Sequence, residues 1–151
     1  MADFIITIRP EPDASRDVDW LQRYKVPAMA LPVMRAEKKP FTLPDEALFQ
    51  AIVFTSRHAV AALANVFSHV SLRSLPVYAV GRNTALAARQ AGFEQVTSGP
   101  GDGKGLLTLM TADLRQDAGK ILWPRASIIS FDIASHLTEF GFSVQQIPVY
   151  T

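Results

Sequence analysis

IVFTSRHAV at residues 52–60 and VYAVGRNTA at 77–85 are the stretches that decide the fold. Each starts with a run of apolar and β-branched residues of strand length, passes through a short polar turn, and enters a segment with helical spacing. Near-continuous apolar runs are typical of strands that are covered on both faces, as in parallel sheets. The two stretches therefore predict repeated strand–helix units and an α/β fold with helices on both faces of a parallel sheet.

Apolar runs of the same kind recur about every 25 residues, which leaves room for one helix between neighbours. Helical spacing predicts helices from about residue 57, over 83–91, around 106–114 and over 131–140. Gly92 and Gly141 follow two of these segments, and glycine at that place ends helices. The expected strands cover residues 4–8, 27–33, 51–56, 76–81, 94–98, 120–124 and 144–150.

The stretch 35–48 interrupts this pattern with a run of charges and with Pro40 and Pro44. We predict a linker there, between a strand–helix–strand fragment at 1–34 and a complete α/β lobe at 49–151. The fragment cannot cover both faces of a sheet by itself. We expect it to need further chain or to associate with a second copy. At the other end, the last predicted strand is still running where the sequence stops.

The composition limits the classes of function. Of the 151 residues, 48% are hydrophobic and 19% are charged, which is within the globular range. The net charge of +1 provides no broad field that would hold nucleic acid or an anionic membrane. Without cysteine there is no disulfide, thiolate nucleophile or cysteine zinc site. Because the start lacks a signal peptide and no segment is long enough to span a bilayer, we expect a cytoplasmic protein.

Familiar ligand motifs are incomplete in this sequence. SGPGDGKG at 98–105 approaches a phosphate-binding loop, but Ser98 and Gly105 stand where that pattern needs a glycine and a hydroxyl. An anion-contacting loop and a plain glycine-rich connection both fit it. VGRNTALAARQAG at 80–92 lacks the G-x-G-x-x-G pattern of dinucleotide-binding proteins. The three histidines are far apart in the sequence, so we expect no metal site.

The turns that follow the predicted strands carry hydroxyl groups, glycines and basic side chains. Ligands of open parallel sheets bind at the carboxyl ends of the strands, where helix N-termini present N–H groups. Neutral donors together with guanidinium groups favour carboxylate or phosphate. The alternative is that the hydroxyls cap helices and that the basic groups are solvated. The candidates for binding in these turns are Ser56, Arg57, Thr84, Ser98, Lys104, Arg125 and Arg9.

Three aromatic residues could have either a structural role in packing or a functional role at a site. Tyr150 lies near the carboxyl end of the last predicted strand, where a neutral phenol can donate a proton at pH 7. The alternative is a strand tyrosine whose ring is packed. For Trp20 and Trp123 we expect packing rather than stacking on a ligand.

Taken together, the motifs resemble the uroporphyrinogen-III synthase family of tetrapyrrole biosynthesis. The resemblance rests on the order and spacing of motifs over nearly the whole chain, most of all FTSRHAV followed by VYAVGRNTA. The other motifs that carry it are RPEPDA, LPVM, AGFEQVTSG with GDGKGL after it, KILWPR and EFGFSVQQIPVY.

The resemblance implies a protein of two flavodoxin-like lobes with the active site in the cleft between them, and no metal or organic cofactor. Such a protein is a lyase that cyclises linear hydroxymethylbilane with inversion of ring D. It is a monomer in its full-length form. By the family's pattern, Tyr150 assists departure of the hydroxyl group, and Ser56 and Thr84 contact the substrate.

Some features depart from the family's pattern. Ile8 precedes the opening Arg-Pro where a hydroxyl residue is common, and Ala126 stands where a glycine often follows Arg125. The family's returning lobe would come after residue 151, so we expect weak or no activity from this chain, and self-association through residues 1–34. Two other functions stay open: a non-enzymatic module that binds a small anion or a partner, and a nucleotide-binding domain suggested by GPGDGKG alone.

Overall fold

The computed structural model describes residues 3–45, 48–65 and 71–151, and its chain divides into two units. Unit 1 is Met1–Glu37 and unit 2 is Lys38–Thr151. Residues 46 and 47 of the expected linker lie outside the described residues.

Unit 1 is one strand–helix–strand unit, made of β1 (Ile5–Thr7), α1 (Asp13–Arg23) and β2 (Ala28–Ala30). The strands pair in parallel, with Ile6 opposite Met29. β2 is shorter than the expected 27–33. Pro27 and Pro32 flank it, and a proline has no N–H to donate to a strand ladder.

Large apolar side chains of unit 1 are exposed. Trp20 is 57% exposed and its ring contacts the ring of Tyr24, with 4.9 Å between centroids. The prediction that Trp20 is packed is therefore wrong. Tyr24 is 66% exposed, and the other large apolar side chains of unit 1 that are at least 45% exposed are Phe4, Ile5, Ile6, Ile8, Met29, Leu31, Val33 and Met34.

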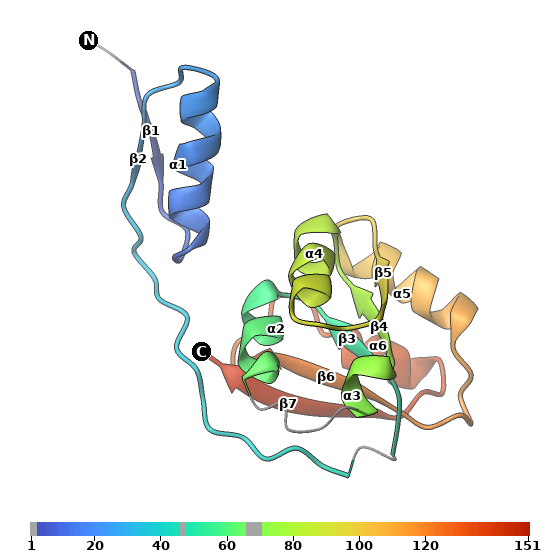
Figure 1. The fold of residues 1–151 in the computed structure, drawn as a ribbon. Helices are drawn as coiled ribbons and strands as arrows, with labels where there is room; N and C mark the ends of the chain where they lie inside the picture. The colour runs from blue at the N-terminus through green and yellow to red at the C-terminus, as the bar shows by residue number, and fades with distance from the viewer. Residues whose placement is uncertain (1–2, 46–47, 66–70) are drawn as a thin grey trace. The chain divides into compact units, whose positions relative to one another are not determined.

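Unit 2 contains a five-stranded, wholly parallel sheet in the order β5-β4-β3-β6-β7 (Figure 1). Its strands are β3 (Phe49–Phe54), β4 (Pro76–Ala79), β5 (Gln95–Ser98), β6 (Lys120–Ala126) and β7 (Val144–Tyr150). Its helices are α2 (Arg57–Ala64), α3 (Ser71–Ser74), α4 (Arg82–Gln90), α5 (Gly103–Asp113) and α6 (Ile133–Glu139).

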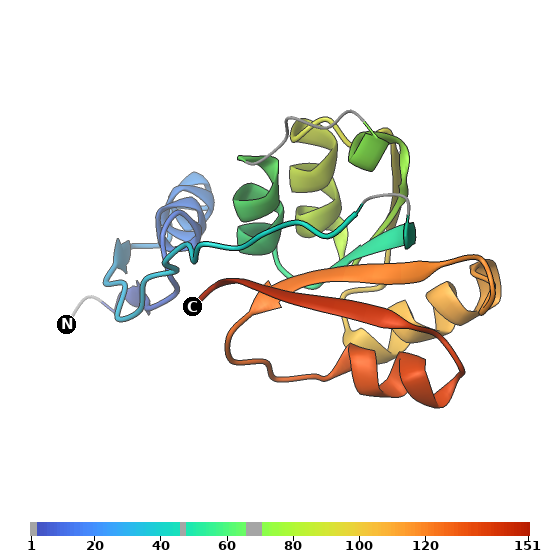
Figure 2. The same ribbon diagram turned by 90° about the horizontal axis from the view of Figure 1, so that it is seen from below.

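Two apolar layers hold unit 2 together, one on each face of the sheet. Alternate side chains of a strand point to opposite faces, so Ile52 and Phe54 of β3 pack with α2 and α4, while Val53 packs with α5 and α6. Figure 2 shows α2 and α4 on one side of the sheet and α5 and α6 on the other. The predicted α/β fold with helices on both faces of a parallel sheet is confirmed.

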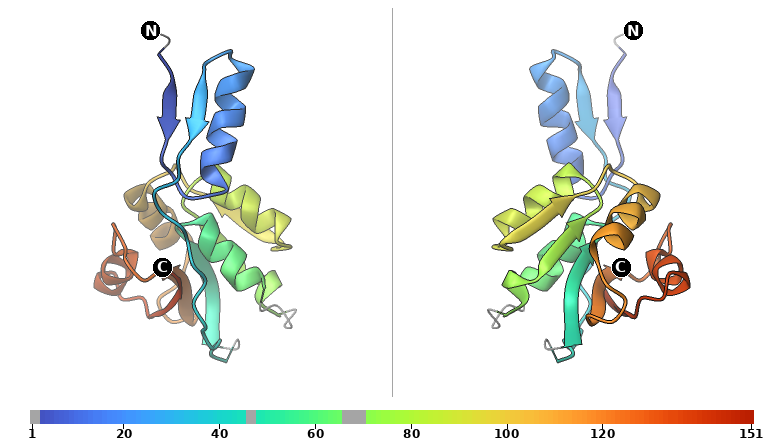
Figure 3. Two further views of the ribbon diagram at one scale, coloured as in Figure 1. Left: turned by 90° about the vertical axis from the view of Figure 1, so that its left-hand side faces the viewer. Right: turned by 90° about the vertical axis from the view of Figure 1, so that its right-hand side faces the viewer.

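The strand order creates a switch point between β3 and β6. From β3 the chain adds β4 and β5 on one side, and it then crosses to place β6 and β7 on the other (Figure 3). Counted within the unit the order is 3-2-1-4-5, whereas flavodoxin itself has 2-1-3-4-5. At such a switch point the helices that follow the two strands lie on opposite faces, which opens a crevice for ligands.

Local signals in the sequence end the helices as predicted. Gly92 and Gly141 have φ of 94° and 85° and directly follow the C-caps of α4 and α6. Glycine adopts this left-handed conformation at little cost.

Part of the stretch expected to be a linker packs onto unit 2. The Lys39 N–H donates to the Val149 carbonyl at 2.9 Å, and Phe41 and Leu43 pack against the core layer that α2 covers. Among the described residues, none of the helices is long and apolar enough to cross a membrane.

Candidate functional site

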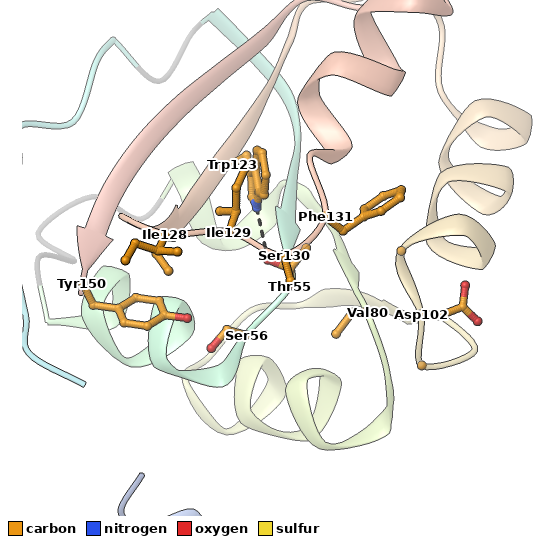
Figure 4. Close-up of a pocket in the computed structure, with 13 residues that line it drawn as sticks. Thr55, Ser56, Val80, Asp102, Trp123, Ile128, Ile129, Ser130, Phe131 and Tyr150 are labelled. Carbon is orange, nitrogen blue, oxygen red and sulfur yellow. Dashed lines mark hydrogen bonds between the residues drawn. The ribbon is translucent and has the colours of Figure 1, made fainter. Parts of the chain in front are cut away.

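A pocket of about 330 Å³ lies at the switch point of the unit 2 sheet, and we call it the switch-point pocket (Figure 4). Its residues follow the carboxyl ends of several strands, because all strands of a parallel sheet end on the same side. The pocket is lined by Thr55, Ser56, Val80, Gly101, Asp102, Gly103, Trp123, Ala126, Ile128, Ile129, Ser130, Phe131 and Tyr150. The structure thus brings together two of the predicted site residues, Ser56 and Tyr150.

Tyr150 is the last residue of β7, and its phenol is directed into the pocket (Figure 4). Its ring lies against the ring of His58, with 5.5 Å between centroids and 45° between planes. Its backbone carbonyl accepts a hydrogen bond from the Ser127 N–H at 2.8 Å. The half-buried ring of Tyr150 is therefore packed against α2, and its hydroxyl still reaches the pocket.

Ser56 connects β3 to α2 and serves the helix as well as the pocket. As the N-cap, it accepts a hydrogen bond from the His58 N–H at 3.1 Å. The capping alternative is therefore correct for Ser56, and its hydroxyl still lines the pocket. The cap is neutral, so the partial positive charge of the α2 N-terminus is not cancelled by a carboxylate.

Thr55 and Trp123 were not predicted as site residues. The Trp123 indole donates to the Thr55 hydroxyl at 3.3 Å and ties β6 to β3 across the switch point. Trp123 is fully buried, so the prediction that it packs is confirmed. The position of Thr55 beside Ser56 was a signal for it, but its partner on β6 was not visible in the sequence.

The N-termini of α5 and α6 carry negative caps. Asp102 caps α5 by accepting from the Gly105 N–H at 2.7 Å. Asp132 caps α6, and its hydrogen bonds from Ser135 hold the pKa of its carboxyl below the usual range. No Lys, Arg or His occurs among the described lining residues, where Asp102 is the charged one. The neutral α2 side of the pocket is thus its favourable end for an anion.

The glycine-rich segment 98–105 is used for close packing. A side chain at Gly103 would collide with the Phe131 ring, and one at Gly99 would lie 2.9 Å from the Val80 carbonyl oxygen. Gly101 and Gly103 line the pocket, whereas Lys104 is exposed and does not. With Asp102 at the helix N-terminus, this segment disfavours a phosphate and fits a strand-to-helix connection better than a nucleotide loop.

Arg125 braces a loop rather than lining the pocket. Its Nε donates to Gln146 at 2.8 Å, and its Nη1 donates to the carbonyls of Ala126 at 2.7 Å and Ser127 at 3.2 Å. The guanidinium is therefore engaged within unit 2, which does not favour a carboxylate contact at this residue.

The other predicted residues of unit 2 do not line the pocket. Thr84 is 7% exposed and lies in the first turn of α4, whose N-cap is Gly81, so it does not cap that helix. Ser98 donates to the carbonyl of Gly99 at 3.3 Å. Arg57 is the first residue of α2 and is half-buried.

Arg9 belongs to unit 1, where two carboxylates balance its charge. Its Nη2 lies 2.7 Å from Asp13 Oδ2, and its Nη1 lies 3.0 Å from both carboxylate oxygens of Asp17. A role in binding substrate stays a prediction for this residue. For a metal ion, the described residues contain no cluster of three or more His, Cys, Asp or Glu side chains.

A doubly wound parallel sheet with a polar pocket at its switch point defines the class, an α/β protein with a candidate small-molecule site at the carboxyl ends of its strands. The family model for uroporphyrinogen-III synthase HemD matches residues 17–151. The chain belongs to the uroporphyrinogen-III synthase family.

Solved structures agree with this family. A uroporphyrinogen-III synthetase from Helicobacter pylori is 26% identical with a TM-score of 0.61, over 82% of this chain and 55% of that chain. A mutant uroporphyrinogen III synthase from Thermus thermophilus is 19% identical with a TM-score of 0.64, over 99% of this chain and 62% of that chain, and it shows the fold alone. The chain spans 55% to 62% of the length of these relatives. No curated protein sequence matches it.

Proposed function

We propose that this chain provides one lobe and part of a second lobe of a uroporphyrinogen-III synthase. The observation that carries the proposal is that the phenol of Tyr150 and the hydroxyl of Ser56 meet in one pocket at the switch point. The substrate would be hydroxymethylbilane, a linear tetrapyrrole that bears eight carboxylates, and the product would be the cyclic type III isomer. No metal or organic cofactor enters the proposed reaction.

The proposed reaction requires one proton donor and a substrate that is held in one geometry. The pyrrole nitrogen pushes electrons toward the hydroxymethyl carbon, the C–O bond breaks, and the oxygen leaves as water with a proton from the Tyr150 phenol. The cationic azafulvene that results is attacked by the substituted α-carbon of ring D, which gives a spiro intermediate. The bond from that carbon to the ring C methylene then breaks, the methylene bonds to the free α-carbon of ring D, and loss of the proton from that carbon leaves ring D inverted. Holding the flexible substrate in this geometry is a large part of the rate enhancement.

The pocket itself supports neutral recognition of carboxylates. The hydroxyls of Thr55, Ser56 and Ser130 and the N-terminus of α2 offer hydrogen bonds without a basic side chain. Its volume of about 330 Å³ is at the lower end of the range for small-molecule sites. It therefore suits a portion of a tetrapyrrole, and we propose that a complete cleft needs a second lobe.

The domain division follows from the same proposal. Residues 1–34 would be a strand–helix–strand fragment of the first lobe, 35–48 the crossing, and 49–151 a complete second lobe. The full protein would act as a cytoplasmic monomer, and the Arg9, Arg57, Thr84, Ser98, Lys104 and Arg125 side chains would be secondary contacts or supports for the substrate.

The test is to incubate the protein with hydroxymethylbilane and to separate the type I and type III products. We expect weak or no type III formation by the 151 residues alone, because the proposed cleft needs a second lobe. A longer form, in which the chain is joined to the residues that the solved relatives have beyond the match, should produce the type III isomer. Only the spontaneous type I product from that longer form would contradict the proposal.

Substitutions in the longer form test which residues contribute to the rate of type III formation. Tyr150→Phe should lower the rate by about 10²-fold or more, since general acid catalysis contributes on that order. Thr84→Ala should lower it less. Tyr78→Phe is a matched control, because Tyr78 bonds to Asp113 and does not line the pocket. If neither Tyr150→Phe nor Thr84→Ala changed the rate, a module that only binds a small anion would be the better description.

A further inference from the structure

Ile128 is the most exposed large hydrophobic side chain among the described residues, with an exposed fraction of 86%. It lies in the loop between β6 and α6 and lines the switch-point pocket. Figure 4 shows Ile128 and Ser56 on opposite sides of the Tyr150 phenol. A single exposed isoleucine is ordinary on a protein surface, but this one forms a wall of a polar pocket.

The loop that carries Ile128 is fixed at both of its ends. At its start, the Ser127 N–H donates to the Tyr150 carbonyl at 2.8 Å, and Arg125 donates to the carbonyls of Ala126 and Ser127. At its end, the Phe131 ring stacks on His136, with 4.9 Å between centroids and 21° between planes. The loop is therefore held on both sides of the exposed Ile128.

The two sides of the pocket differ in chemistry. The α2 side presents the hydroxyls of Thr55 and Ser56, which suit carboxylates, whereas the loop side presents the aliphatic side chains of Ile128 and Ile129 together with the single hydroxyl of Ser130. A pyrrole has the matching form, because its flat ring is apolar and its acid groups project from the edge. Covering an exposed isoleucine with a ring face removes apolar surface from water, which favours binding.

We propose that Ile128 packs on the face of a pyrrole ring of the substrate and selects pyrrole carboxylates over other carboxylates. Arg125 is the positioning residue that holds Ile128 in place through the loop. The inference rests on the proposed function and adds to it the group that recognises the ring. It also places an aliphatic side chain beside the Tyr150 phenol, where a bound ring keeps water away from the proton donor.

The experiment measures binding to the 151-residue chain by calorimetry. The probes are porphobilinogen, a monopyrrole with one acetate, one propionate and one aminomethyl group, and adipate, an aliphatic compound with the same number of carboxylates but no ring and no ammonium group. Ile128→Ser should weaken porphobilinogen binding roughly tenfold, because about two methylene equivalents of apolar contact are lost. Adipate binding should stay unchanged, and Ile128→Leu should be close to the parent protein.

Leu86→Ala is the matched control, since Leu86 is 53% exposed on α4 and does not line the pocket. It should leave both affinities unchanged. Equal porphobilinogen affinity for the parent and Ile128→Ser would overturn the inference, as would the absence of saturable porphobilinogen binding to the parent. The proposed function is judged separately by the type III product, so the two can fail independently.

Arg125→Gln separates the two roles of the arginine. If Arg125 positions the loop, the variant should lose porphobilinogen affinity several-fold and keep its adipate affinity. A parallel loss for both probes would mean that Arg125 contacts carboxylates directly, and it would overturn the positioning role. Thermal unfolding of each variant checks that unit 2 remains folded.

Discussion

The ring of His58 lies against the ring of Tyr150, with 5.5 Å between the centroids and 45° between the planes. The contact joins the first turn of α2 to the last residue of β7 at the edge of the switch-point pocket. A phenol that donates a proton must be held in one orientation, and an aromatic neighbour limits its motion.

His58→Ala should therefore lower the rate of type III formation about two- to thirteenfold, because aromatic pairs contribute about 0.5–1.5 kcal/mol. His58→Phe should retain most of the rate, since it keeps a ring in place. The measurement is turnover of hydroxymethylbilane by the longer form. In a Tyr150→Phe background the His58→Ala change should have no further effect, and an undiminished effect there would contradict a positioning role.

Ser56 should show separate effects on stability and on binding. Ser56→Ala removes the N-cap of α2 and should lower the free energy of unfolding by about 1 kcal/mol. Ser56→Asp keeps a cap and favours the helix dipole, so its stability should match the parent. It places a negative charge in the pocket, however, and should abolish adipate binding. Denaturant unfolding and calorimetry test the pair, and unimpaired adipate binding by Ser56→Asp would exclude an anion at this end.

We expect the protein to lose stability at alkaline pH as Tyr78 ionises. Burial, with the nearby Asp113 carboxylate, raises the pKa of Tyr78 to about 12. The folded state therefore favours the neutral phenol, and the stabilisation is fully present below the ordinary tyrosine pKa of about 10. It is lost as the pH rises from about 10 to about 12. The free energy of unfolding should fall over this range in the parent and less steeply in Tyr78→Phe; equal slopes would refute the assignment.

Gly103 should not tolerate a side chain. The added Cβ of Gly103→Ala would collide with the Phe131 ring, so we expect a loss of about 1–3 kcal/mol. Because the cause is one contact, the combination with Phe131→Ala should cost less than the sum of the two single changes. A double-mutant cycle in denaturant unfolding measures this coupling, and strict additivity would show that the strain arises elsewhere.

Unit 1 should drive association of the 151-residue chain. Its two-stranded sheet leaves apolar side chains such as Ile6 and Met29 nearly half exposed, and exposed apolar strands pair with other chains. Size-exclusion chromatography with light scattering should show a mass that rises with concentration. Ile6→Lys should reduce it. A strictly monomeric parent at every concentration would contradict this expectation.

The elements of unit 2 could be predicted because their signals are local. The apolar run 51–56 and the periodic segment after it became β3 and α2, and Gly92 and Gly141 follow the ends of α4 and α6. Ser56 and Tyr150 could be proposed because each stands at a predicted strand end. The predictions that relied on charge alone were less informative, since Arg9 and Arg125 are engaged within their own units.

The sequence by itself determined the alternation of strands and helices, the helix ends and the residues at the strand ends, because each depends on spacing within a few positions. Only the tertiary structure decided that β6 lies beside β3, which brings Trp123 to Thr55 across 68 residues of chain. The same arrangement turned Arg125 into a brace and left Ile128 over the pocket. Such contacts depend on strand order and on the path of a loop, and no local pattern of residues encodes these.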